Sequence, residues 1–201
     1  NIAFNWINIV KITDFLITPF QQKFKHPLKT ADQNFTHRDG FIIQIMFNEF
    51  TGYGESSPLN GFNTETLQEV SYALESYRLS IVDLGEISVD ELLSFIPIHC
   101  DGFASVEFGL ETAIYDLASK IEGKSLAKYL NPSAQNRILS NGIAGIHSPE
   151  ENHSTLKVKV GLRNLFDELN YLDELTRKFG EDVKFRLDAN GSMYLVQAIR
   201  F

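Results

Sequence analysis

Lys157 and Lys159 are the residues of this chain whose types and spacing most directly predict chemistry. They alternate with aliphatic residues at period two, so in a strand both ammonium groups project from one face. A second alternating stretch, residues 183–188, carries Arg186 and Asp188 on one face in the same way. A local cluster of cations in an acidic chain suits an anionic ligand or a metal-bound carboxylate. We therefore expect two charged strand faces that form one site.

A helix must connect these two strands if they are to lie side by side. Residues 164–179 are expected to form it, and Gly180 follows as a C-cap. Its leucines at helical spacing are expected to face inward: Leu165, Leu169, Leu172 and Leu175. The length of the whole segment fits a parallel strand–helix–strand unit. Charges at the C-terminal ends of parallel barrel strands usually mark chemistry, so this unit predicts an active site.

Residues 137–143 are expected to form a further strand before this unit. A complete eight-fold barrel needs about 250 residues, so residues 135–201 have room for only about three of its strands. The pattern at the C-terminal end stops within an expected helix. We therefore expect the opening βα units of a barrel, truncated after about three strands.

Residues 1–134 show patterns of a different class, in which strands are followed by helices. We expect strands at 2–18, 41–47 and 51–56, and helices from Asn63 or Thr64, at 88–96, at 103–121 and at 125–130. Residues 19–40 are polar and contain prolines, which predicts a loop, and Pro97 is expected to close the second helix. The predicted fold class is α/β plus α+β, with an α+β domain at 1–134 and the partial barrel at 135–201.

Composition bounds the partners of the chain. Its 201 residues are 43% hydrophobic and 12% aromatic, which suffices for a substantial core in one or two domains. A net charge of −8 without a basic block argues against nucleic acid. Cys100 is the only cysteine, so no disulfide can form within the chain, and we expect it to be a small buried hydrophobe. With no membrane-length apolar run and no signal-peptide pattern, we expect no membrane partner and a cytoplasmic location.

The order and spacing of several motifs together resemble a known family. Residues 157–161 and 186–190 resemble the paired K-x-K and R-x-D-x-N strand-end motifs of the enolase superfamily, muconate-lactonizing subgroup. Residues 38–40, 52–67 and 104–113 are similar to the capping domain of o-succinylbenzoate synthases. The resemblance extends over nearly the whole chain. It implies an α+β capping domain over a modified TIM (β/α) barrel.

The resemblance also implies a reaction. In this superfamily a lysine abstracts the proton next to a carboxylate, and a bound Mg²⁺ stabilises the enediolate. The substrate is thus a small-molecule carboxylate. For o-succinylbenzoate synthases it is a cyclohexadiene carboxylate, and loss of water gives an aromatic precursor of menaquinone or phylloquinone. The expected activity is therefore that of a Mg²⁺-dependent hydro-lyase.

Physical chemistry supports a role for each motif residue. We expect Lys159 to be the base, because a second ammonium, the metal and partial burial would all lower its pKa. Lys157 would supply positive charge to the carboxylate and to its neighbour. Asp188 at a strand end is a suitable ligand for a hard Lewis-acid cation. Arg186 and Asn190 would position Asp188 or the polar groups next to it.

The loop at 57–62 would contact the substrate from the capping domain. Leu59, Gly61 and Phe62 are the candidate contacts, although packing alone would also explain them. Asn60 stands where the family often has proline, which leaves this loop less rigid. The histidines show no metal-ligand spacing and are expected in loops or at the surface: His26, His37, His99, His147 and His153.

Other readings stay open. A dipeptide epimerase or N-acylamino acid racemase shares the first step and returns the proton from the opposite face. A non-catalytic truncated paralogue is a third possibility. The family also needs two further acidic ligands and an opposing lysine from later strands, so we expect this chain alone to bind Mg²⁺ weakly and to be inactive. Its open barrel edge would be covered by the missing C-terminal half or by another copy.

Overall fold

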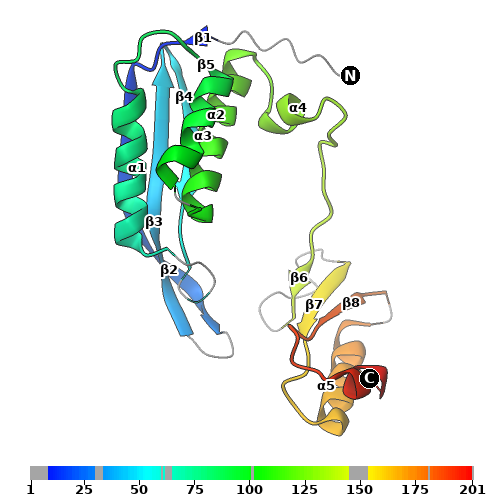
Figure 1. Cartoon of the computed structure of the whole chain (residues 1–201). Coiled ribbons are helices and arrows are strands. Elements are labelled where there is room, and N and C mark those ends of the chain that lie inside the picture. Colours follow the sequence, from blue (N-terminus) through cyan, green and yellow to red (C-terminus); the bar gives the residue numbers. More distant parts are fainter. Residues whose placement is uncertain are drawn as a thin grey trace. The chain divides into compact units, whose positions relative to one another are not determined.

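A computed structural model describes residues 9–29, 34–59, 61, 65–100, 102–144, 154–180 and 182–200. The chain divides into two compact units, Asn1–Ala134 and Gln135–Phe201, called here the N-terminal and C-terminal units. Each has its own sheet and its own helices (Figure 1). Within the described ranges, no helix combines the length and the apolar composition needed to cross a membrane.

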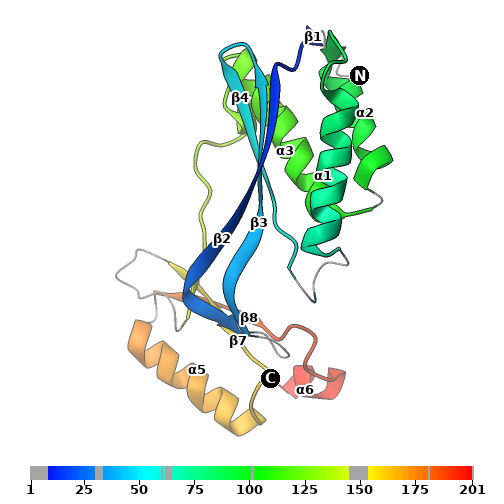
Figure 2. The same cartoon turned by 90° about the vertical axis from the view of Figure 1, so that its left-hand side faces the viewer.

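The N-terminal unit is built on an antiparallel sheet in the order β2-β3-β4. Its strands are β2 (Asp14–Lys29), β3 (Asn34–Phe47) and β4 (Phe50–Ser56). A short pair, β1 (Ile9–Val10) with β5 (Ile87–Ser88), lies apart from this sheet. The helices are α1 (Leu67–Ile81), α2 (Val89–Cys100), α3 (Ala104–Ile121) and the short α4 (Leu126–Leu130). Helices α1 to α3 all lie on one side of the sheet (Figure 2).

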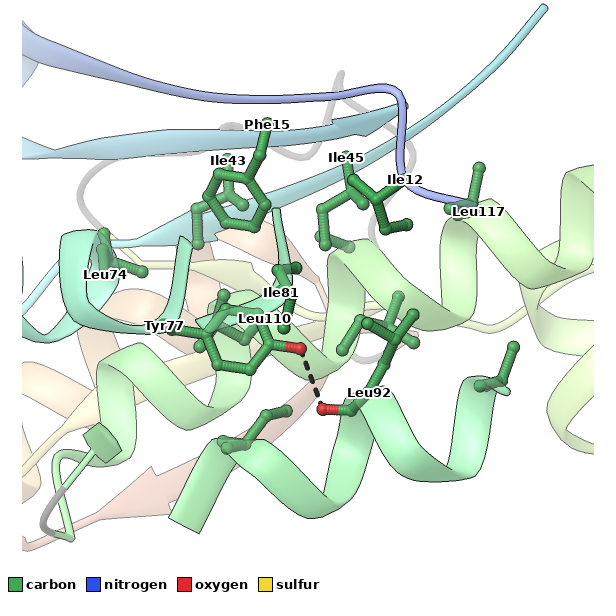
Figure 3. Packing of buried hydrophobic residues seen from close by; sticks show 14 of the residues in the cluster. Ile12, Phe15, Ile43, Ile45, Leu74, Tyr77, Ile81, Leu92, Leu110 and Leu117 are labelled. Carbon is green, nitrogen blue, oxygen red and sulfur yellow. Dashed lines mark hydrogen bonds between the residues drawn. The ribbon is translucent and has the colours of Figure 1, made fainter. Parts of the chain in front are cut away.

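The core of this unit lies between the sheet and these helices. Phe15, Ile43 and Ile45 of the sheet point toward the helical residues Leu110 and Leu117 (Figure 3). All of them are buried, which removes apolar surface from water. The Tyr77 hydroxyl within this core donates a 2.8 Å hydrogen bond to the Leu92 carbonyl, so its polar end is satisfied. Cys100 is also buried here, which confirms the expectation from composition.

The expected loop at 19–40 is wrong, because β2 and β3 run through most of it as a long hairpin. Pro19 pairs in register with Phe41 inside β2. Since β2 is an edge strand, a residue without an N–H is tolerated there. The register shifts between Lys23 and Leu28, which places an irregularity in the outer part of the hairpin.

Two expected helix boundaries also move. α1 begins after Thr66 rather than after Asn63 or Thr64, which lie outside the described residues. Thr66 and Glu69 form a reciprocal capping box that fixes this start. α2 begins as expected after Ser88, but it continues through Pro97 to Cys100. Pro97 lies exposed within α2, where its missing N–H removes one backbone hydrogen bond without ending the helix.

β4 and α3 approach each other through glycines. A Cβ atom at Gly52 would lie 2.1 Å from the Ala113 carbonyl oxygen, and one at Gly54 would lie 1.9 Å from that of Gly109. Neither position has room for any side chain. The G-x-G pattern of the sequence therefore serves close packing of a strand on a helix.

The C-terminal unit is a parallel sheet in the order β6-β7-β8. Its strands are β6 (Gly142–Ile143), β7 (Thr155–Lys159) and β8 (Lys184–Asp188). β6 is shorter than the strand expected at 137–143. α5 (Leu165–Phe179) joins β7 to β8, and α6 (Leu195–Arg200) follows β8. An α+β unit followed by the strands of a partial barrel is the predicted fold class.

The core of the C-terminal unit is small. Val158, Val160 and Leu175 form its buried cluster, and Leu172 packs against them from α5. Leu156 of β7 is buried as well. The expectation that Leu165 and Leu169 face inward is wrong, since they are 41% and 45% exposed. The apolar residues of α5 cover more than one face of the helix, and only the face that includes Leu172 and Leu175 meets the sheet.

Candidate functional site

The two charged strands lie next to each other as the alternation predicts. β7 and β8 are parallel, with Lys157 opposite Arg186 and Lys159 opposite Asp188. Both lysines are exposed, whereas Val158 between them is buried. The four charged side chains therefore share the polar face of the sheet, and the aliphatic face of β7 packs in the core. Lys159 is exposed rather than partly buried in this chain, contrary to our expectation.

Asp188 is held by two donors at the end of β8. The Lys157 Nζ lies 2.6 Å from Asp188 Oδ2, and these side chains are 48% and 29% exposed. The backbone N–H of Asn190 donates to Asp188 Oδ1 at 3.0 Å. Asn190 has φ 47° and Gly191 has φ 74°, the left-handed region that Asn and Gly tolerate in tight turns. This turn aims the N–H of Asn190 at the carboxylate.

The pKa of the Asp188 carboxyl lies below its ordinary value. The largest cause is the hydrogen bond from Lys157, followed by the backbone N–H of Asn190. The charges of Lys157 and Lys159 lower it further. Asp188 is therefore a carboxylate at neutral pH, the form that binds a hard cation.

The sequence did not reveal which neighbouring groups contact Asp188. Asn190 contacts Asp188 through its backbone, so the turn conformation matters more than its amide side chain. Arg186 stands opposite Lys157 in register and is exposed. The charged partner of Asp188 is Lys157, which we expected to act on the substrate.

The fit of this site to Mg²⁺ is partial. Mg²⁺ demands octahedral oxygen coordination, commonly from one or two carboxylates with waters and substrate. Asp188 supplies one ionised carboxylate at a strand end. In the ranges that the structure describes, no group of three or more His, Cys, Asp or Glu side chains could hold a metal ion. The described residues therefore offer one suitable ligand of such a site rather than a complete set.

The loop after β4 is the second candidate region. Leu59 is half-buried and Gly61 has φ 85°, while Phe62 lies outside the described residues. The Arg38 guanidinium donates to the Ser57 carbonyl, and Ser57 Oγ donates to Glu55 Oε1 at 2.6 Å. A hollow of about 430 Å³ lies beside this network. Its lining residues are Arg38, Glu55, Ser57, Ala104, Ser105 and Phe108.

No sequence pattern singled out two carboxylates, Glu65 and Glu168, that the structure buries. Glu65 is 6% exposed, and its Oε1 accepts the Ser105 N–H at 2.9 Å in the first turn of α3. The N-cap residue Phe103 makes no side-chain capping bond, so Glu65 does this from another segment. Glu168 is 1% exposed and binds the loop after β7. Its only sequence signal is an acidic residue near a helix start, which usually indicates a solvated charge.

The histidines take no part in these sites as far as they are described. His37 is exposed and bonds to Thr36, and the His99 ring bonds to Ser76 Oγ at 2.9 Å. The side chain of His26, and the residues His147 and His153, lie outside the described part of the chain.

Known proteins resemble both units. A family model described as "MenC, N-terminal domain" matches residues 19–117. The L-Ala-D/L-Glu epimerase of Clostridium acetobutylicum is 24% identical in an alignment 202 residues long, which covers 94% of this chain and 56% of that protein. The o-succinylbenzoate synthase of Proteus mirabilis is 32% identical over 164 residues, which are 80% of this chain and 45% of that protein.

Solved structures show the same fold. The dipeptide epimerase from Enterococcus faecalis V583, complexed with Mg and the dipeptide L-Leu-L-Tyr, matches with a TM-score of 0.80 and 22% identity, over 94% of this chain and 56% of that chain. The o-succinylbenzoate synthase from Thermosynechococcus elongatus BP-1, complexed with Mg, matches with a TM-score of 0.66 and 23% identity, over 92% and 55%. The chain thus spans about half the length of the relatives it matches.

Proposed function

We propose that this chain belongs to the enolase superfamily and, from that premise, that the complete protein is an o-succinylbenzoate synthase. It would remove water from a cyclohexadiene carboxylate by syn-elimination, in menaquinone or phylloquinone biosynthesis in the cytoplasm. Residues 1–134 would be the capping domain and residues 135–201 the opening of the barrel. The observation that carries the chemistry is the ion pair of Lys157 with Asp188 beside Lys159. The family model over 19–117 favours the synthase.

Lys159 would take the proton from the carbon next to the substrate carboxylate. The electron pair of that C–H bond forms the new double bond, and the C–O bond on the neighbouring carbon breaks. In a syn-elimination the departing hydroxyl lies on the face of the base, so the protonated Lys159 donates its proton to that hydroxyl, which leaves as water. Neither an oxidant nor a reductant is needed.

The neighbouring residues would bind and orient. Lys157 would remain charged and hold Asp188 in place from one side, as the Asn190 N–H does from the other. Arg186 would add positive charge to the same face. Asp188 would be one ligand of Mg²⁺, which would supply Lewis-acid stabilisation of negative charge on the substrate. Leu59, Gly61 and Phe62 would contact the substrate from the capping domain.

A dipeptide epimerase is the second candidate. The epimerase of Clostridium acetobutylicum aligns with 94% of this chain, more than the 80% aligned with the Proteus mirabilis synthase. An epimerase shares proton abstraction by Lys159 but needs a second acid on the opposite face. That group would come from outside this chain, as would the remaining metal ligands.

The test gives both substrate classes to the complete protein with Mg²⁺. We expect wild type to convert the cyclohexadiene carboxylate into an aromatic product. Lys159→Ala should lose about 10²- to 10⁴-fold in kcat, the usual contribution of a general base. Lys184→Ala, at the opposite end of β8, is the matched lysine control and should keep wild-type rates.

Each other outcome has a distinct meaning. Epimerisation of L-Ala-L-Glu without dehydration would identify the protein as an epimerase and contradict the proposed synthase activity. Wild-type rates in Lys159→Ala would assign the base to another residue. Inactivity of wild type toward both substrates would favour a non-catalytic paralogue.

A further inference from the structure

Glu168 is a buried carboxylate next to the segment that follows Lys159. Its side chain is 1% exposed. Among the described residues of the C-terminal unit, no other acidic side chain is buried. Burying a carboxylate is costly unless it is paired and hydrogen-bonded, so a glutamate in this position needs a physical reason.

The partners of Glu168 all belong to one short segment between β7 and α5. Its Oε2 accepts three successive backbone N–H groups: Gly161 at 2.9 Å, Leu162 at 3.1 Å and Arg163 at 3.1 Å. Its Oε1 accepts from Arg163 Nη1 at 3.2 Å. Because every partner is a donor, a group that only accepts is required here, and a carboxylate is such a group.

The same segment is fixed on its other side by the end of β8. The Val160 N–H donates to the Asp188 carbonyl at 3.1 Å. Gly161 has φ 78°, and a Cβ atom there would lie 2.2 Å from Ser192 Oγ. Lys159 therefore precedes a segment held by Glu168 on one side and packed against the turn after Asp188 on the other.

We propose that Glu168 is a positioning residue for Lys159: by binding three consecutive backbone N–H groups of residues 161–163, it fixes the end of β7 from which Lys159 reaches the substrate. This inference rests on the proposed function of Lys159 as the base. Glu168 does not touch the reacting atoms, and it acts through the backbone. Its removal misplaces the amine without removing it.

Glu168→Gln is the most informative variant. Glutamine has nearly the same shape and one oxygen that can accept backbone N–H groups. Its NH₂ would face donors, either the backbone N–H groups or the Arg163 guanidinium, so the segment must shift. Glu174→Gln is the matched control, since it removes the same charge from an exposed position on the same helix.

The experiment measures kcat, KM, Tm and the primary deuterium isotope effect on kcat in the complete Mg²⁺-loaded protein. The probes are the cyclohexadiene carboxylate and L-Ala-L-Glu, each deuterated at the carbon next to the reacting carboxylate. Lys159→Ala is measured in the same series. For Glu168→Gln we expect kcat to fall about 10²-fold, the scale of an ångström-sized misplacement, with KM unchanged. The isotope effect should rise because proton transfer becomes slower relative to the other steps.

The isotope effect separates positioning from simple loss of folded protein. A smaller folded fraction lowers the rate but leaves the isotope effect of the remaining enzyme unchanged. A wild-type isotope effect in Glu168→Gln, or wild-type kcat, would overturn the inference. If this variant does not fold, Glu168→Asp decides: it keeps the charge but withdraws the acceptor by one methylene, and unchanged kcat and isotope effect there would equally overturn it.

The series also distinguishes the two proposals. If wild type converts a probe and Lys159→Ala does not, the proposed base stands whatever Glu168→Gln does. If Lys159→Ala retains wild-type turnover, the proposed function of Lys159 fails first, and the positioning role of Glu168 fails with it.

Discussion

The two units of this chain use the same kinds of elements but hold them together differently. In the N-terminal unit, one face of the sheet is covered by α1 to α3 and a large cluster of apolar side chains is buried. In the C-terminal unit, the buried cluster is Val158, Val160 and Leu175, and polar contacts organise the strand ends. The comparison teaches that the residues suited to chemistry lie where apolar packing is thinnest. There, specific hydrogen bonds must position the backbone.

The largest expected effect tests this difference in packing directly. Leu110→Ala in α3 should lower the free energy of unfolding of the N-terminal unit by about 4 kcal/mol, since Leu110 is fully buried in the large apolar cluster and its truncation leaves a cavity there. Leu175→Ala in α5 should lower the free energy of unfolding of its own unit by about 2 kcal/mol, because the apolar cluster around Leu175 is smaller and its side chain is 7% exposed. Native-state hydrogen exchange reads the two units separately.

Leu79→Ala is the control for this pair, because Leu79 is 65% exposed on α1 and its truncation should change little. Equal losses for the two buried leucines would contradict the difference between the units.

Helix capping should give an intermediate effect of equal size in both units. The Glu69 N–H bonds to Thr66 Oγ1 at the start of α1, and the Asp167 N–H bonds to Asn164 Oδ1 at the start of α5. Thr66→Ala and Asn164→Ala should therefore each cost about 1 kcal/mol.

The same exchange measurement applies to these caps, with Thr66→Ser and Asn164→Asp as capping-competent controls. A clearly larger loss in one unit would mean that local interactions, and not only the core, separate the two units.

The smallest expected effect concerns the charged strand face. The folded-state pKa of Asp188 lies below its ordinary value of 3.8. The ionised carboxylate therefore stabilises the fold above that value, and this stabilisation is lost as pH falls through the lowered pKa. Lys157→Ala should move the pKa back toward 3.8, because the hydrogen bond from Lys157 is the largest cause of the shift.

An NMR titration of the Asp188 carboxyl carbon measures this pKa in wild type and in the variant. Lys184→Ala should leave it unchanged. A pKa that stays low in Lys157→Ala would mean that the turn at Asn190, and not the ion pair, controls Asp188.

Much of the fold follows from periodicity. The alternation around Val158 predicts which face of β7 is buried, and the apolar stripe at 103–121 predicts α3 almost to its ends. The hairpin at 19–40 could not be read in this way. Prolines and polar residues predict a loop unless one knows that β2 is an edge strand. The prediction of the inward face of α5 was wrong for a similar reason, since the sequence does not show which apolar stripe meets the sheet.

The site was predictable in its residues but not in its contacts. Period two places Lys157 and Lys159 on one face, and the following strand adds Asp188. The bond from Asn190 depends on a turn conformation, and the role of Glu168 depends on a loop folding back onto its own helix. Both are tertiary features without a periodic pattern in the sequence.

The glycine contact between β4 and α3 has a mechanical consequence. Where a strand meets a helix through side chains, small sliding movements can be absorbed by changes of rotamer. At Gly52 and Gly54 the two backbones touch, so no deformable layer lies between them. A displacement of the loop after Ser56 that moves β4 is therefore transmitted directly to α3. Any adjustment of that loop to a ligand must bend the loop itself or displace the helix with it.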